Sequence, residues 1–158
     1  MNKITQQLWF EKDMEAALRC YTTLIPGSAV QWRTTLPADS PSGPAGHVTI
    51  AGFTLGDQRY LAFEAGKLDS FNHSFSISVE CADQAEIDRL WHGLGDGGVI
   101  EQCGWLRDRW GLSWQIVPKC LGEWVYGADR EKARRVAEAM LGMVKLEIAG
   151  LEAAARGD

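Results

Sequence analysis

The chain has 158 residues, a formal net charge of −5 and 46% hydrophobic residues. This size and balance are typical of one soluble globular domain, or of two small modules that share a core. No Lys/Arg stripe accompanies the negative charge, so a nucleic-acid partner is not expected. The first 15 residues lack the apolar run of a secretion signal, and no segment approaches the roughly 20 apolar residues that span a bilayer. We therefore expect no membrane association and a cytoplasmic location.

The cysteines are widely spaced, and no C-x-x-C occurs. Neither a zinc knuckle nor a thioredoxin-like redox pair is indicated. We expect four reduced, mostly buried thiols, namely Cys20, Cys81, Cys103 and Cys120.

The first half predicts the element order β-α-β-β-β. Asp13 offers an N-cap side chain to an amphipathic helix that ends at Pro26-Gly27. The Pro/Ser/Gly composition of Pro37 to Gly46 predicts an exposed, mobile loop. The expected elements are a strand at 4–10, a helix at 14–25, a strand at 28–36, and a hairpin of strands at 47–55 and 59–65.

The second half repeats this order. Asp83 precedes another amphipathic helix. The expected elements are a strand at 74–81, a helix at 84–94, and short strands at 97–102, 104–110 and 113–118. The repeated order indicates duplication of a unit of about 60 residues. We therefore predict an α+β fold in a single domain over 1–158, with modules at about 1–70 and 71–120 and a helical tail at about 121–158.

The tail from Ala128 to Arg156 is rich in strong helix formers. Its apolar residues recur at helical spacing and must find a hydrophobic surface, which is either the same chain's sheet or a second subunit. They are Val136, Met140, Met143, Val144, Ile148 and Leu151.

The segment Gly93 to Gly98, "GLGDGG", superficially matches the G-x-G-x-x-G dinucleotide signature. That signature needs a strand before it and a helix after it, so that phosphate meets the N–H groups of the helix end. Here the order is reversed, so we interpret the glycines as a helix C-cap and tight turn.

The two modules, opened by "LWFEKDMEAALRCY" and "SFSISVECADQAEIDRLW", resemble the vicinal oxygen chelate superfamily, which includes glyoxalase I and bleomycin-resistance proteins. More narrowly, "QCGWLRDRWGLSWQIVP" and the C-terminal "AEAMLGMVKLEIAGLE" resemble its PhnB-like branch, often labelled demethylubiquinone methyltransferase-like. The resemblance implies a glyoxalase/bleomycin-resistance fold in which each module curls its sheet into half a barrel around a cleft. It also implies a homodimer.

In metal-dependent members of the superfamily, strands of both modules supply four ligands. The resemblance carries the first-strand position to Gln6, or to Gln7 if the register slips by one, and the fourth-strand position to near Glu64. It carries the fifth-strand position to His73 or Ser74, and the eighth-strand position, usually Glu, to Gln115. A site made of Gln6, Glu64, His73 and Gln115 would hold a dication with a single carboxylate, which compensates its charge weakly.

Strand alternation adds two expectations about the site. Ser113 and Gln115 share one face of the last strand with Val117, which favours that face as the cleft. Glu64 faces the cleft if Leu61 and Phe63 face the helix layer. Trp9, Trp32, Trp105 and Trp114 lie in strands, where they either pack in the core or line a cleft for a planar ligand. The charges of "LRDRW", 106–110, are interpreted as a solvated ion-pair ladder.

Three functions follow from this resemblance. We expect a protein that binds a small organic molecule between the modules without a tightly held metal. The alternative is a metal-dependent lyase, isomerase or dioxygenase-like enzyme acting on a small oxygenated substrate, with Glu64 as ligand or base and His73 as ligand or proton shuttle. The third is the methyltransferase of the branch label, for which the sequence offers no Gly-rich strand–loop–helix to hold S-adenosylmethionine.

Overall fold

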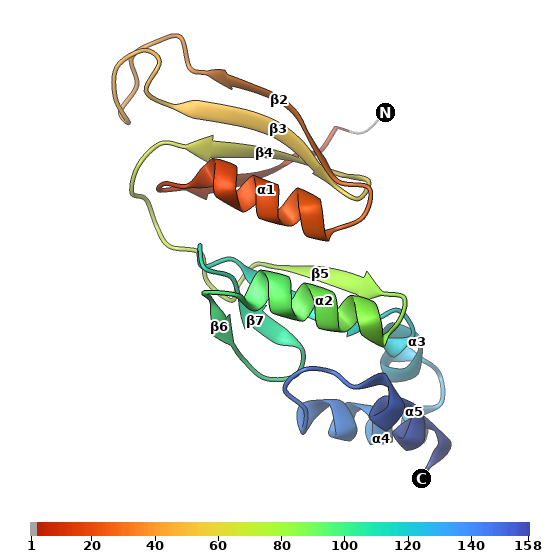
Figure 1. Ribbon diagram of the computed structural model, residues 1–158. Coiled ribbons are helices and arrows are strands. Elements are labelled where there is room, and N and C mark those ends of the chain that lie inside the picture. Colours follow the sequence, from red (N-terminus) through yellow and green to blue (C-terminus); the bar gives the residue numbers. More distant parts are fainter. Residues whose placement is uncertain (1–2) are drawn as a thin grey trace. The chain divides into compact units, whose positions relative to one another are not determined.

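The computed structural model describes residues 3–158, which form two units, one ending at Ser70 and one running from Phe71 to Asp158 (Figure 1). Each unit contains a four-stranded sheet with a helix. The predicted α+β class and the repeated β-α-β-β-β order are confirmed. No helix among the described residues is long and apolar enough to span a membrane.

The first unit is built from one helix and four strands. In the sheet β1 is parallel to β4, and the other neighbouring strands are antiparallel, in the order β1-β4-β3-β2. Figure 1 shows α1 lying along one face of this sheet. The elements are β1 (Gln6–Phe10), α1 (Met14–Leu24), β2 (Ala29–Thr35), β3 (Thr49–Leu55) and β4 (Gln58–Glu64).

The two faces of this first sheet differ in burial. Beneath α1, the alternate residues Tyr60 and Ala62 of β4 are almost fully buried. Leu61 and Phe63 lie on the other face and are only partly buried. Glu64 was expected to face the cleft if Leu61 and Phe63 faced the helix layer. This condition is not met, because Tyr60 and Ala62 pack against the helix instead.

The helix-free face of the first sheet is aromatic. Trp9 stacks on Phe63 with ring centroids 6.1 Å apart, and its Nε1–H donates to the Gly66 carbonyl at 2.9 Å. The ring of Trp32, 47% exposed, lies directly over Gly52. A Cβ at Gly52 would come within 2.3 Å of that ring, so only glycine lets the indole lie flat on the strand.

The second unit repeats the topology with shorter strands. Its order β5-β8-β7-β6 again places the first strand parallel to the last. The elements are β5 (Ser76–Cys81), α2 (Gln84–Gly95), β6 (Val99–Ile100), β7 (Trp105–Arg107) and β8 (Ser113–Pro118). α2 ends at Gly95, Gly97 has a positive φ of 74° and β6 follows, so the turn interpretation of 93–98 is confirmed.

A buried carboxylate shapes the turn between β7 and β8. Asp108 is 3% exposed and accepts hydrogen bonds from the N–H groups of Trp110 and Leu112 and from Trp114 Nε1. The interpretation of 106–110 as a solvated ion-pair ladder is therefore wrong at its centre. Trp114 is fully buried and lies in the core, not in a cleft. The alternating charges of 106–110 did not indicate this burial. A buried Asp needs several hydrogen-bond donors, and two of the donors here are backbone N–H groups, which a sequence pattern does not reveal.

The tail is not one helix but three. They are α3 (Leu121–Tyr126), α4 (Arg130–Leu141) and α5 (Ile148–Arg156). The expected C-terminal helix is interrupted at 142–147, because the carbonyls of Met143 and Val144 accept hydrogen bonds from the N–H groups of Cys103 and Gly104 at 2.9 and 2.8 Å. The stripe finds its surface within the same unit, where the buried residues Leu121, Val136, Leu146 and Leu151 form a core.

The loop predicted to be exposed and mobile has internal hydrogen bonds. Ser40 and Gly43 form an isolated antiparallel bridge, and the Gly46 N–H donates to the Leu36 carbonyl at 2.8 Å. Most of its residues are exposed, as expected from the composition.

Candidate ligand-binding site

The second unit contains a pocket of about 490 Å³. It lies between the helix-free face of the sheet and the helices of the tail. Its lining comes from three parts of the chain, the sheet, the segment before β7 and the tail. The residues are Ser78, Glu80, Gln102, Cys103, Trp105, Gln115, Val117, Pro118, Leu121, Gly122, Val125, Tyr126, Met140 and Leu141.

The sheet supplies the polar wall. Ser78 of β5 pairs with Gln115 of β8, and Glu80 pairs with Val117, so alternate residues of both strands face the pocket. The intervening Trp114 and Ile116 are fully buried on the α2 side. Gln115 Nε2–H donates to Ser76 Oγ at 2.9 Å, which fixes the amide along the sheet face.

The tail supplies the apolar wall through α3 and α4. It is held to the body of the unit by polar contacts. The Gln84 amide donates to the Leu146 carbonyl at 3.0 Å and accepts from the Ile148 N–H at 2.8 Å. Lys145 Nζ lies 2.7 Å from Asp88 Oδ1, and this hydrogen bond is the largest cause that lowers the pKa of Asp88. The apolar wall is thus anchored to α2.

Charge in the pocket is confined to one carboxylate. Glu80 is exposed and has no hydrogen-bond or ion-pair partner among residues 3–158, and the lining contains no Lys, Arg or His. Cys103 adds a thiol, and its φ of 59° is unusual for a residue with a side chain. Cys81, by contrast, is buried, and burial raises the pKa of its thiol to about 12.

The structure separates the residues predicted in the first unit. In the parallel pairing Gln6 lies beside Tyr60, and Phe10 lies beside Glu64. Gln6 and Glu64 are thus four register positions apart, roughly 13 Å along the strands at about 3.3 Å per residue. Glu64 Oε2 accepts the N–H of Met14 at 2.9 Å and caps α1. Gln7 lies on the opposite face of the sheet from Glu64.

The residues predicted in the second unit have different surroundings. His73 Nε2 lies 2.8 Å from Glu101 Oε2, and its side chain is 55% exposed. Ser74 precedes β5, and its N–H donates to Asn72. Ser113 is fully buried, and its hydroxyl has no hydrogen-bond partner among the described residues. Of Gln6, Glu64, His73, Ser113 and Gln115, only Gln115 lines the pocket, and it does so together with Trp105 and Val117.

The two residues of the first unit proposed as metal ligands, Gln6 and Glu64, are separated along the sheet. Gln6 and Glu64 lie four positions apart in register, and Glu64 already accepts a backbone N–H. Ligand oxygens must lie within about 2.6 Å of a hard dication. Among the described residues, no group of three or more His, Cys, Asp or Glu side chains could hold a metal ion.

Sequence reasoning missed Glu80 and the tail's contribution to the pocket. The signal for Glu80 was present, because Ser76, Ser78 and Glu80 alternate with apolar residues along β5. The sequence indicated Met140 only as one residue of an apolar helical stripe. It did not indicate that Met140 and the adjacent Leu141 line a pocket. That arrangement depends on the break at 142–147.

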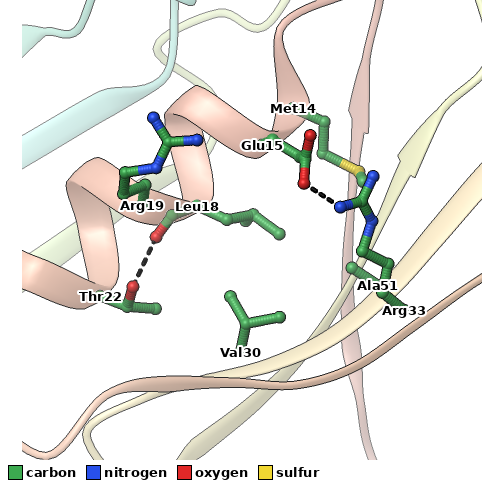
Figure 2. A pocket seen from close by; sticks show the side chains of 8 residues that line it. All are labelled: Met14, Glu15, Leu18, Arg19, Thr22, Val30, Arg33 and Ala51. Carbon is green, nitrogen blue, oxygen red and sulfur yellow. Dashed lines mark hydrogen bonds and ion pairs between the residues drawn. The ribbon is translucent and has the colours of Figure 1, made fainter.

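A second hollow, of about 350 Å³, lies in the first unit between α1 and the sheet. Figure 2 shows Leu18 of α1 and Val30 of β2 pointing toward one another across it, with Arg33 joined to Glu15 at one side. Its lining includes two arginines, Arg19 and Arg33. This hollow differs from the pocket of the second unit in charge and in its position beside the helix.

The family model for 3-demethylubiquinone-9 3-methyltransferase matches residues 2–117. Residues 118–158 lie outside that match, so the family model does not support the resemblance of the C-terminal segment "AEAMLGMVKLEIAGLE" to the PhnB-like branch. The chain matches no curated protein sequence significantly.

Solved structures share the fold. The PhnB protein of Bacillus cereus is 30% identical, with a TM-score of 0.65 over 74% of this chain and 99% of that one. Protein PA1353 of Pseudomonas aeruginosa is 20% identical, with a TM-score of 0.61 over 75% and 98%. Glyoxalase I of Leishmania major is 13% identical, with a TM-score of 0.52 over 75% and 87%. The last two are similar in fold alone.

Proposed function

Because the chain belongs to the 3-demethylubiquinone-9 3-methyltransferase family, the PhnB-like branch of the vicinal oxygen chelate superfamily, we propose that it binds a small organic molecule without a tightly held metal. The site is the pocket of the second unit. The observation that carries this proposal is the cavity of about 490 Å³, which has a polar sheet wall and an apolar helical wall. Ligand pockets of a few hundred Å³ with mostly apolar linings and a few polar groups are typical of small-molecule sites.

The lining suits recognition more than chemistry. Gln115 and Ser78 offer hydrogen bonds, Trp105 offers a flat aromatic surface, and Glu80 is the carboxylate that could accept a proton. General acid–base catalysis commonly uses a second titratable group or a positioned electrophile. The pocket contains Cys103 as a thiol but no histidine or basic side chain.

The two catalytic alternatives have less support. The metal-dependent enzyme needs ligands that converge, and Gln6 and Glu64 lie four register positions apart. The methyltransferase activity in the family description needs a site for a methyl donor. The glycine-rich segment 93–98 ends a helix instead of starting one, so its N–H groups are not arranged for a phosphate or nucleotide.

We also propose that the protein is a cytoplasmic homodimer. The motive is the resemblance to the superfamily, together with the aromatic face of the first sheet, where Trp32 is 47% exposed. An exposed apolar surface of this kind commonly marks an interface. Light scattering after size exclusion tests this proposal, and a monomer at micromolar concentration would contradict it.

The binding proposal is tested by thermal-shift screening of the purified full chain with a library of small aromatic compounds, with and without EDTA. We expect stabilisation by at least one compound that EDTA does not change. Gln115→Ala should reduce that stabilisation, because it removes the amide that faces the pocket. Gln58→Ala, which changes an exposed amide of the first unit, is the matched control and should leave it unchanged.

A stabilising effect seen only with added divalent metal would contradict this proposal. Elemental analysis gives a second measurement. A stoichiometric metal that is lost in Glu64→Gln would favour the metal-dependent enzyme instead.

A further inference from the structure

We propose that the C-terminal helices convert the sheet face of the second unit into a pocket selective for neutral or cationic amphipathic molecules and against anions. This inference rests on the proposed function, because it names the ligand class of the same pocket. It assigns the apolar contacts to residues beyond the family match and the charge preference to Glu80.

The helices are an addition to the shared fold. The family match ends at residue 117, and the B. cereus PhnB structure covers 74% of this chain while matching 99% of its own length. The residues after this match contribute Leu121, Val125, Tyr126, Met140 and Leu141 to the lining. A chain with the shared fold alone would present an open sheet face at this place.

The added wall is preorganised. Leu121 belongs to the buried core that α3, α4 and α5 share, and Val125 and Met140 pack against that core. The backbone at 143–144 is hydrogen bonded to Cys103 and Gly104, immediately before β7. A wall held at both ends limits the size and shape of a ligand without paying the entropy of closing a loop.

The rim of this wall is apolar and accessible. Leu141 is 63% exposed and Tyr126 is 84% exposed. Covering these side chains with an apolar ring removes hydrophobic surface from water, at about 25 cal/mol per Å². The wall therefore favours a ligand with an aromatic or aliphatic body.

The opposite wall sets the charge preference. Glu80 lies on the sheet face without a partner among the described residues, and no basic side chain lines the pocket. An anion would meet an uncompensated carboxylate, whereas a cation would pair with it. Trp105, which is partly buried in the same lining, adds an aromatic face that attracts cations. The hollow of the first unit contrasts with this, because its lining holds Arg19 in addition to the ion pair of Arg33 with Glu15.

The test uses three probes with the same naphthalene ring and different head groups. They are 1-naphthylmethylamine (an ammonium at pH 7), 1-naphthalenemethanol (a neutral alcohol) and the anion of 1-naphthaleneacetic acid (a carboxylate). Dissociation constants are measured by calorimetry with the full chain at pH 7 and low salt. We expect the ammonium compound to bind about tenfold more tightly than the carboxylate, with the alcohol between them, because attraction and repulsion at a solvent-accessible carboxylate are each modest. Equal or reversed affinities would overturn the charge preference.

Glu80→Gln isolates the carboxylate. We expect it to reduce the ratio between ammonium and carboxylate probes to below about threefold while leaving the alcohol unchanged. Glu123→Gln, an exposed carboxylate of α3 outside the lining, is the matched control and should retain the ratio. If both variants reduced the ratio equally, net charge and not the pocket would explain it, and the inference would fail.

Leu141→Ala tests the added wall. It should weaken the alcohol probe about fivefold, since it removes apolar contact area. Val144→Ala, a 43% exposed apolar residue of the same tail outside the lining, should not. Thermal midpoints of both variants confirm that they are folded. An unchanged affinity in Leu141→Ala would overturn the role of the wall.

The Cys103 thiol reports where the probe binds. Alkylation by iodoacetamide, followed at each cysteine by mass spectrometry, should slow at Cys103 in the presence of the ammonium probe and remain unchanged at Cys20 of the first unit. Binding of a probe without protection of Cys103 would place it elsewhere and overturn the inference. Stabilisation by other compounds that protect Cys103 but show no charge preference would leave the proposed function intact, so the two failures are distinguishable.

Discussion

The two units repeat one topology but use their helix-free sheet faces differently. The first face is aromatic, with Trp9 stacked on Phe63 and the Trp32 ring over Gly52. The second is polar, with Ser78, Glu80 and Gln115 in register. The two units therefore share a scaffold, while the residues that point outward from their helix-free faces differ.

The two units also differ in how the N-termini of α1 and α2 are capped. Asp83 Oδ1 accepts the Glu86 N–H at 2.9 Å and caps α2. Asp13 occupies the equivalent position before α1, but with a φ of 61° it makes no side-chain cap. Glu64 caps α1 from the end of β4 instead. The resemblance places a metal ligand at the end of β4, but the Glu64 carboxylate there caps α1. The candidate ligand contacts therefore lie in the second unit.

The largest effect that would break this comparison is expected at Asp108. Asp108→Ala removes the carboxylate that accepts hydrogen bonds from the N–H groups of Trp110 and Leu112 and from Trp114 Nε1 in a buried turn. We expect a loss of about 3 kcal/mol in the free energy of unfolding, because buried donors are left without partners. Urea denaturation followed by tryptophan fluorescence measures it.

The first unit supplies the control for this prediction. Its corresponding hairpin turn is made by Gly56 and Asp57, and Asp57 is exposed. Asp57→Ala should change stability by less than about 0.5 kcal/mol. Similar losses in both variants would mean that the two turns are equivalent after all.

The helix caps give the next effect. Glu64→Ala and Asp83→Ala should each cost about 1 kcal/mol, because each removes a carboxylate that accepts a first-turn N–H. The loss is read from the unfolding midpoint in urea. A neutral result for Glu64→Ala would mean that the strand-end carboxylate is not committed to α1 and is free for another role.

Asp13 should respond in the opposite direction. Asp13→Gly removes the cost of a left-handed backbone without losing a side-chain cap, so we expect a gain of about 0.5 kcal/mol. The equivalent change Asp83→Gly should give no gain, since Asp83 has an extended backbone and a working cap. Destabilisation by Asp13→Gly in thermal unfolding would contradict this account.

The sequence predicted the architecture well because its signals are local. Alternation, helical spacing and turn residues specify the β-α-β-β-β order twice, and Asp83 caps as expected. The cap of α1 could not be predicted from Asp13, because Glu64 is 50 residues away along the chain from the N–H it accepts. A local sequence pattern does not show which distant side chain caps a helix when the residue at the N-cap position makes no cap.

The candidate site was predictable only in part, for the same reason. Gln115 was predicted because the resemblance carries the eighth-strand ligand position to it and because strand alternation placed it on the expected cleft face, and it lines the pocket. The helical wall was not, because helix propensity extends through 128–156 while the hydrogen bonds of Met143 and Val144 to Cys103 and Gly104 interrupt the helix. Tertiary contacts that override propensity cannot be read from a helical stripe.

The smallest effect concerns the ion pair that anchors the tail of the second unit. The first unit has no equivalent tail. The hydrogen bond from Lys145 lowers the pKa of Asp88, so its contribution is complete above the ordinary carboxylate pKa and is lost as the pH falls through the lowered value. The same pairing raises the pKa of Lys145, so the contribution persists up to the ordinary lysine pKa and is lost only as the pH rises through the raised value. Asp88→Asn should lower the thermal midpoint at pH 7 by no more than about 2 °C, because both groups are solvent-accessible. The difference from the unmodified chain should shrink as the pH falls through the lowered pKa of Asp88, below which Asp88 is protonated in both the folded and the unfolded state. A difference that did not shrink as the pH was lowered would assign the effect to the hydrogen bond from Gln84 and not to the charge.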